Sequence, residues 1–222
     1  MNQLLLRKVS YFSVLRSKIG TKKIAELFEA VNKQLKDQGL ITGIFNFVDA
    51  SQIISKINIW SERDKAIAAG LKKFNNTTAS KVATDPQARF GCKGNEKYWY
   101  GYKRNIAACM KFGFITKVAI TSADVTDSKA LKHVCPKQGA VYADKGYSDQ
   151  TAESIMKHNG CENRAILKNN MKKKDFARDG KISKKRMPFE RIFSKQSKKA
   201  RYRGICKNQF QGFMQALAFN FK

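Results

Sequence analysis

The chain has 222 residues, of which 42% are hydrophobic and 11% aromatic, which is enough apolar material for one sizeable folded domain and argues against wholesale disorder. It carries 44 Lys and Arg against 17 Asp and Glu, a formal net charge of +27, so its natural partner is a polyanion, with nucleic acid ahead of an anionic membrane surface. Five cysteines without a Cys-x-x-Cys pair and only two histidines argue against a zinc site, a disulfide framework and a histidine-based triad.

Two amphipathic helices are expected at the start of the chain. Residues 21–38 carry apolar side chains at helical spacing, between a threonine that can cap the helix and a glycine that can end it. A weaker pattern over residues 3–17 favours another helix. We expect both to pack beside the main domain.

The first strand is expected at residues 41–48, which are apolar, β-branched and aromatic, with Asp49 at its C-terminal end. Residues 61–96 are polar and indicate a long surface excursion with one short helix near 63–73. Residues 97–121 are expected to form a hairpin of two strands.

A second strand, residues 139–143, is followed directly by Asp144. The remaining expected elements are a helix from Ser148 to about His158, a short strand at 164–167, a helix at 186–198 and a closing helix at 205–221. Strands that alternate with helices around a hairpin predict an α/β fold, a mixed sheet with helices on its faces.

Three acids are candidates for metal chemistry. Asp49 and Asp144 each follow a hydrophobic strand, so adjacent strands would bring both to one sheet edge, and Glu190 lies on an expected helix among cations. Three converging carboxylates suit two Mg²⁺ or Mn²⁺ ions held about 3.5–4 Å apart. Each acid alone also fits a turn, a cap or a surface counter-charge, such as Glu190 to Arg186. The prediction therefore depends on all three together.

Several segments resemble those of the bacterial insertion-sequence DDE transposases whose catalytic domain is ribonuclease H-like. They are residues 47–51, 85–89, 93–95, 100–103, 123–127 and 143–147, and Arg186 and Glu190 followed by 200–204. The resemblance runs from about residue 24 to the end. It implies a ribonuclease H-like fold, and it makes Asp49, Asp144 and Glu190 the metal-binding catalytic triad, with two Mg²⁺ or Mn²⁺ ions.

The segment around Glu190 departs from the family pattern at two positions. Ser183 stands where the family has Tyr, and Ser197 stands where it has Lys. Lys198 comes one residue later, which on a helix is a rotation of about 100°. Its long, flexible stem can still reach a phosphate.

Cations gather around Glu190, with 17 Lys and Arg against three acids in residues 164–207. A phosphodiester backbone lying across the site would account for this excess; a solvated basic face or an RNA-binding tail is the alternative. The side chains expected to contact the DNA backbone are Lys103, Arg104, Arg186, Arg191, Lys198, Arg201 and Arg203. The aromatic side chains between positions 98 and 102 could stack on bases, but we favour a core role for them.

The leading hypothesis is a DNA transposase that cuts at transposon ends and joins the freed 3′-hydroxyl to target DNA, with a homodimer on the DNA left open. We divide the chain into a helical segment, residues 1–39, as the remnant of a longer region, and a catalytic domain, residues 40–222. No apolar run approaches the roughly 18 residues of a membrane span, so a cytoplasmic, nucleoid-associated protein is expected. The alternatives are an inactive, truncated remnant and a basic nucleic-acid-binding protein in which the three acids do not converge.

Overall fold

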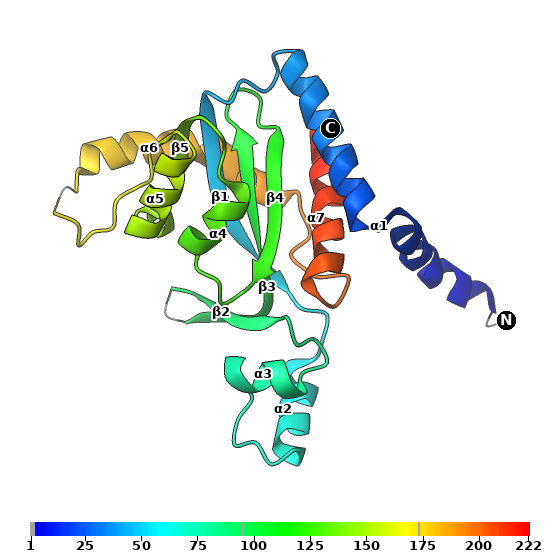
Figure 1. Ribbon diagram of the computed structural model, residues 1–222. Helices are drawn as coiled ribbons and strands as arrows, with labels where there is room; N and C mark the ends of the chain where they lie inside the picture. Colours follow the sequence, from blue (N-terminus) through cyan, green and yellow to red (C-terminus); the bar gives the residue numbers. More distant parts are fainter. Residues whose placement is uncertain (1–2, 95, 173) are drawn as a thin grey trace.

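The computed structural model describes residues 3–94, 96–172 and 174–222. In these residues one mixed sheet is covered by helices on both faces (Figure 1). The strands are β1 (Phe45–Ile54), β2 (Arg89–Lys93), β3 (Lys97–Cys109), β4 (Ile115–Ser122), β5 (Gly139–Ala143) and β6 (Cys161–Asn163). The helices are α1 (Gln3–Asp37), α2 (Ile59–Ala68), α3 (Asn76–Val82), α4 (Asp127–Val134), α5 (Gln150–His158), α6 (Phe176–Ser194) and α7 (Ile205–Asn220), with a 3-10 turn η1 (Lys145–Tyr147).

The sheet has an antiparallel half and a parallel half. β3 pairs antiparallel with β1, with β2 along its first residues and with β4 along the rest. β1, β5 and β6 run parallel to one another. The chain passes through α5 between β5 and β6, and it passes through the antiparallel strands and α4 between β1 and β5. This confirms the predicted α/β class and a mixed sheet of the ribonuclease H-like kind, with the expected hairpin as its antiparallel part.

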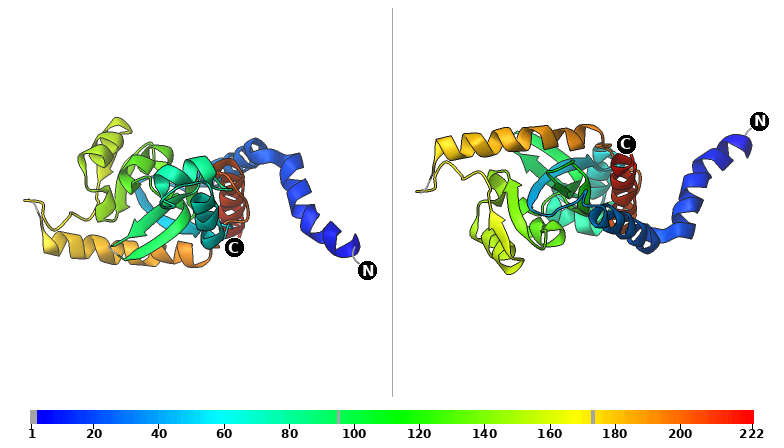
Figure 2. Two further views of the ribbon diagram at one scale, coloured as in Figure 1. Left: turned by 90° about the horizontal axis from the view of Figure 1, so that it is seen from below. Right: turned by 90° about the horizontal axis from the view of Figure 1, so that it is seen from above.

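Alternating side chains of β1 build the cores on the two faces of the sheet. Val48 points into a core that includes Leu131 of α4 and Met156 of α5. Phe47 points into the other core, which α1, α6 and α7 close and which includes Phe210. Figure 2 shows α6 and the α4–α5 pair on opposite sides of the sheet. The parallel strands are therefore covered on both faces, which is why β5 reads as a continuous hydrophobic run.

The long helix α1 is broken at Gly20, whose φ of 72° and ψ of 164° are not helical. After the break, Ile24 and Phe28 are buried against the body, and the Phe28 ring lies 5.5 Å from that of Phe213 on α7. Before the break, the N-terminal part of α1 extends away from the sheet (Figures 1 and 2). The expectation of packing beside the main domain is thus confirmed for residues 21–38. For residues 3–17 it remains a prediction, although Arg16 lies 5.3 Å over the Tyr202 ring.

Several boundaries differ from the predicted ones because packing overrode the local signals. β1 runs to Ile54 rather than ending at 48, since its antiparallel pairing with β3 continues. β6 occupies Cys161–Asn163 instead of 164–167, and Asp149 rather than Ser148 caps α5. The region between β1 and β2 holds both α2 and α3, which lie below the sheet in Figure 1.

Two helices carry weak sequence signals. α4 was not predicted, although the Thr126 hydroxyl caps it by accepting a hydrogen bond from the Lys129 amide. α6 begins ten residues earlier than expected. Gly180 disfavours a helix locally, so the sequence did not indicate this first part of α6. The helix also ends at Ser194, before the position expected to carry the family's Lys.

Candidate active site

Asp49 and Asp144 lie on neighbouring parallel strands. The parallel pairing of β1 with β5 ends at Val48 opposite Ala143, and Asp49 and Asp144 are the next residues along the chain. Asp49 lies within β1 rather than at its end, because β1 continues along β3. The two acids are adjacent, as the sequence predicted. The prediction placed both at strand ends, however, and only Asp144 follows the end of its strand, β5.

Glu190 comes to this edge on α6, which lies over the face of the sheet that carries Asp49. Phe189 stacks on the Phe47 ring at 5.9 Å, and Ile182 and Ile192 are buried beneath the helix. These contacts set the rotation of α6. Residues four apart share one side of a helix, so Arg186 faces the acids together with Glu190.

The Arg186 guanidinium contacts all three acids. Its Nη2 lies 3.0 Å from Asp49 Oδ2 and 3.8 Å from Glu190 Oε1, and its Nη1 lies 4.0 Å from Asp144 Oδ1. Three carboxylates that are far apart in the sequence therefore meet around one positive charge. Asp49 is the least accessible of them, with a side chain 21% exposed against 50% for Asp144 and 56% for Glu190.

The protein environment disfavours the charged form of Asp49. Burial raises the pKa of the Asp49 carboxyl to about 6, even though Arg186 and the hydrogen bond from the Ala50 amide lower it. The nearby Asp144 and Asp127 charges raise the pKa further. A cation bound beside Asp49 would therefore stabilise the charged form of this carboxyl.

The donor set fits a hard divalent cation. Across the described ranges, no three His, Cys, Asp or Glu side chains lie close enough together, as they stand, to hold a metal ion. The carboxylates nevertheless converge on the Arg186 guanidinium, and the side chains of Asp144 and Glu190 are about half exposed. Carboxylate oxygens are the ligands that Mg²⁺ and Mn²⁺ prefer.

The acids open onto a groove at the sheet edge, which we call the acid groove. Its lysine side chains are Lys93, Lys97, Lys103, Lys145, Lys168 and Lys198. They come from the β2–β3 hairpin, from η1 and from the segments before and after α6. A phosphodiester strand in this groove would meet cations around the carboxylates.

Three of the expected DNA contacts line the acid groove. Lys198 does so although it lies one residue from the family's position, and because α6 has already ended, no helical rotation separates it from that position. Lys103 lines the groove with its Nζ 2.8 Å from Asp127 Oδ1 and 2.9 Å from the Val125 carbonyl oxygen. Arg186 is only 4% exposed and is held by the acids.

The other expected contacts lie elsewhere. Arg104 is 1% exposed and donates hydrogen bonds to the Ser197 carbonyl oxygen, at 3.0 Å, and to Gln215. Its neighbours give it a role inside the fold, where a phosphate does not reach it. Arg191, Arg201 and Arg203 are exposed but are not among the residues that line the groove.

Sequence reasoning missed Asp127 as a groove residue. Its carboxylate pairs with Lys103, and a Cβ on Gly146 would lie 3.3 Å from Asp127 Oδ2, so Asp127 packs directly beside the η1 turn that follows Asp144. Tyr147 of the same turn is buried, and its hydroxyl has no hydrogen-bond partner among the described residues. The available signal was the place of Asp127 in the segment 123–127, directly after a capping threonine.

Two of the segments that resemble the transposases, residues 85–89 and 200–204, make buried structural contacts away from the acid groove. The Asp85 carboxylate accepts a hydrogen bond from the Tyr102 hydroxyl and one from the Gly204 amide. This ties residues 85–89 and 200–204 to β3 and sets where α7 begins. Trp99, Tyr100 and Tyr102 are all buried, as the core interpretation of these aromatics predicted, while Tyr98 is 70% exposed.

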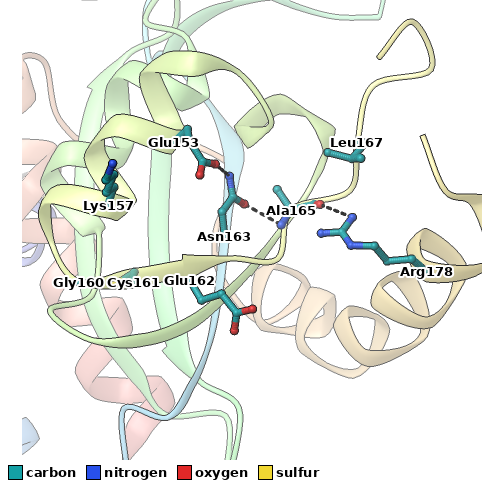
Figure 3. Close-up of a pocket in the computed structure, with 9 residues that line it drawn as sticks. All are labelled: Glu153, Lys157, Gly160, Cys161, Glu162, Asn163, Ala165, Leu167 and Arg178. Atoms are coloured by element: carbon teal, nitrogen blue, oxygen red, sulfur yellow. Dashed lines mark hydrogen bonds between the residues drawn. The ribbon is translucent and has the colours of Figure 1, made fainter. Parts of the chain in front are cut away.

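A second hollow lies between α5, β6 and the start of α6 (Figure 3). Its lining residues are Glu153, Lys157, Gly160, Cys161, Glu162, Asn163, Ala165, Leu167 and Arg178. Figure 3 shows Asn163 linking the Glu153 carboxylate to the Ala165 amide, and Arg178 donating to the Ala165 carbonyl oxygen. These polar groups bind one another, and none of the three clustered acids lines this hollow.

Comparison with known proteins points to one family. The family model described as "Transposase DDE domain" matches residues 76–221, a range that includes Asp144 and Glu190. No significant similarity was found to curated proteins or to solved structures. Of the helices that the structure describes, none combines the length and hydrophobicity needed to cross a bilayer.

Proposed function

Because the chain belongs to the transposase DDE domain family, we propose that it is a DNA transposase in which Asp49, Asp144 and Glu190 hold divalent cations and act on the phosphodiester backbone. The observation that carries the proposal is the meeting of these three carboxylates around Arg186. A basic nucleic-acid-binding protein without catalytic activity would have no reason to gather them.

Two bound Mg²⁺ or Mn²⁺ ions would supply an activated water or 3′-hydroxyl and stabilisation of the leaving oxygen. The chain's own residues do the rest. Asp49 and Asp144 are held in register by the pairing of β1 with β5, and Glu190 by the packing of α6. The lysines of the acid groove bind the phosphates on either side of the scissile bond. Lys198 is the proposed counterpart of the family's Lys.

The reaction has two parts, cleavage at the transposon ends and attack of the freed 3′-hydroxyl on target DNA. The second part exchanges one phosphodiester for another, so no nucleotide hydrolysis is needed. Residues 40–222 form the proposed catalytic domain, and residues 1–39 the helical segment beside it. A protein with these substrates works in the cytoplasm at the nucleoid, and a homodimer would hold two ends at once.

The test is Mn²⁺-dependent nicking of supercoiled plasmid, together with strand transfer of a labelled transposon end. The variants Asp49→Asn, Asp144→Asn and Glu190→Gln should lose both activities. They should keep bulk DNA binding, since each removes only one negative charge from a chain whose net charge is +27. Asp124→Asn is the matched control, because Asp124 is exposed and does not line the acid groove.

Full nicking by Asp49→Asn would refute the assignment of the triad. A wild-type chain that binds Mn²⁺ and DNA and nicks nothing would instead identify an inactive relative with an intact metal site.

A further inference from the structure

We propose that Arg186 is a positioning residue, whose guanidinium holds Asp49, Asp144 and Glu190 together when no divalent cation is bound and is displaced when one binds. This role rests on the proposed function, because it takes the three acids as metal ligands. It assigns to Arg186 a task at the protein's own carboxylates, before any contact with DNA.

The need for such a residue follows from the charges. Three carboxylates in a partly buried site repel one another, and this repulsion is strongest where water is excluded. Arg186 answers it with contacts of 3.0, 3.8 and 4.0 Å to the three acids. A planar guanidinium can face several carboxylates at once through its fork of donors, which the single ammonium of a lysine cannot do.

The contacts of Arg186 show what keeps it in place. It is 4% exposed, and its guanidinium lies over the Phe47 ring at 5.6 Å, a cation–π contact. Its Nε is buried and has no hydrogen-bond partner in the described part of the chain. The ion pairs recorded for it join it to the three clustered acids. Arg186 is thus held by groups that a divalent cation would also bind.

A bound divalent cation and the Arg186 guanidinium could not both remain beside Asp49 without strong repulsion. A divalent cation on Asp49 would lie within a few ångströms of a guanidinium that now contacts the same carboxylate at 3.0 Å, and like charges at such distances repel strongly. The Asp49 pair is the shortest and the least exposed, so the exchange takes place there. Arg186 also lines the acid groove, so the displaced guanidinium can pair with a phosphate when DNA is present.

The experiment measures Mn²⁺ binding to the DNA-free protein, by the loss of the free-Mn²⁺ resonance in electron paramagnetic spectra. Arg186→Gln should bind Mn²⁺ about tenfold more tightly than wild type, because removing the competing charge outweighs the poorer placement of the acids. Arg186→Lys keeps the charge and should stay within about threefold of wild type. Lys184→Gln, at an exposed position on the same helix that does not line the groove, should bind as wild type does.

Asp49→Asn separates the two proposals. If it binds Mn²⁺ as tightly as wild type, Asp49 is not a ligand and the proposed function fails with it. If binding depends on Asp49 and Arg186→Gln is folded yet binds Mn²⁺ equally or less tightly than wild type, only the role of Arg186 is overturned.

A measurement on the wild-type chain covers the case in which Arg186→Gln does not fold. With ¹⁵N-labelled arginine, the Nε–H resonance of Arg186 is assigned by its absence from Arg186→Lys. Saturating Mg²⁺ should shift this resonance and make its proton exchange faster with water, because the guanidinium leaves its buried position. An Arg186 resonance unchanged by Mg²⁺, in a protein shown to bind it, would overturn the proposal.

Discussion

Replacing Asp49 by Asn should change how the stability of the metal-free protein depends on pH. Burial raises the pKa of the Asp49 carboxyl from an ordinary value of 3.8 to about 6 in the folded state, despite Arg186. Each pKa unit corresponds to about 1.4 kcal/mol, so the shift is worth about 3 kcal/mol. The side chain is 21% exposed, which makes this figure an upper limit.

The sign follows from where the proton is bound. Between pH 3.8 and about 6 the folded protein binds a proton at Asp49 that the unfolded chain has released. The free energy of unfolding therefore falls as the pH rises through this window. The contribution of Asp49 is complete below the lower value and lost above the upper one. Asn cannot titrate, so the Asp49→Asn variant lacks this dependence.

The assay is urea unfolding in EDTA at a series of pH values from 4 to 7.5, for wild type and Asp49→Asn. Other groups also titrate, but they cancel in the difference between the two free energies of unfolding. That difference, wild type minus variant, should fall by up to about 3 kcal/mol from pH 4 to pH 7. At pH 7, Mg²⁺ should stabilise the wild type and have little effect on the variant.

Asp179→Asn is a control in which the pKa shift of the replaced carboxyl has the opposite sign. Burial alone would raise the pKa of the Asp179 carboxyl, but hydrogen bonds from Lys174 and the Leu167 amide, with the charges of Lys174 and Arg178, lower it below its usual value. Its contribution is therefore present above about pH 5 and lost only in stronger acid. A wild-type-minus-Asp49→Asn difference as flat as this control across pH 5–7 would refute the reasoning, because Asp49 would then be charged throughout that range.

Two further predictions concern a glycine and a lysine. Gly139→Ala should lower the free energy of unfolding by at least about 2 kcal/mol, because φ is +83° and a Cβ would collide with the carbonyl oxygens of residues 43–44. The control Gly70→Ala, at φ +77° with open space around it, should lower it by about 1 kcal/mol. Equal losses for the two variants in urea unfolding would contradict the clash. Lys198→Gln should reduce the slope of log affinity for DNA against log salt by about 1, measured by fluorescence anisotropy. Lys33→Gln, exposed on α1 and absent from the acid groove, should leave the slope unchanged, and equal slopes for the two variants would place the DNA elsewhere.

The elements that could be predicted are those whose signal is local. β5, α5 and α7 follow from their hydrophobic patterns and end signals, and the β3–β4 hairpin from two hydrophobic runs around a turn. α6 could not be delimited, because Gly180 and Pro188 disfavour a helix and its stability comes from burying Ile182 and Ile192. Tertiary packing of this kind leaves little trace in the local pattern.

The same division holds for the acid groove. The hydrophobic runs before Asp49 and Asp144 predicted that each acid would follow buried strand residues, and the parallel pairing of Val48 with Ala143 brings the two acids side by side. Only the tertiary structure decided that Arg186 is buried among the acids and that Asp127 joins them. Those placements depend on how α6 crosses the sheet and how α4 meets the η1 turn, and such long-range contacts are set by the packing of whole elements rather than by the spacing of residues along the chain.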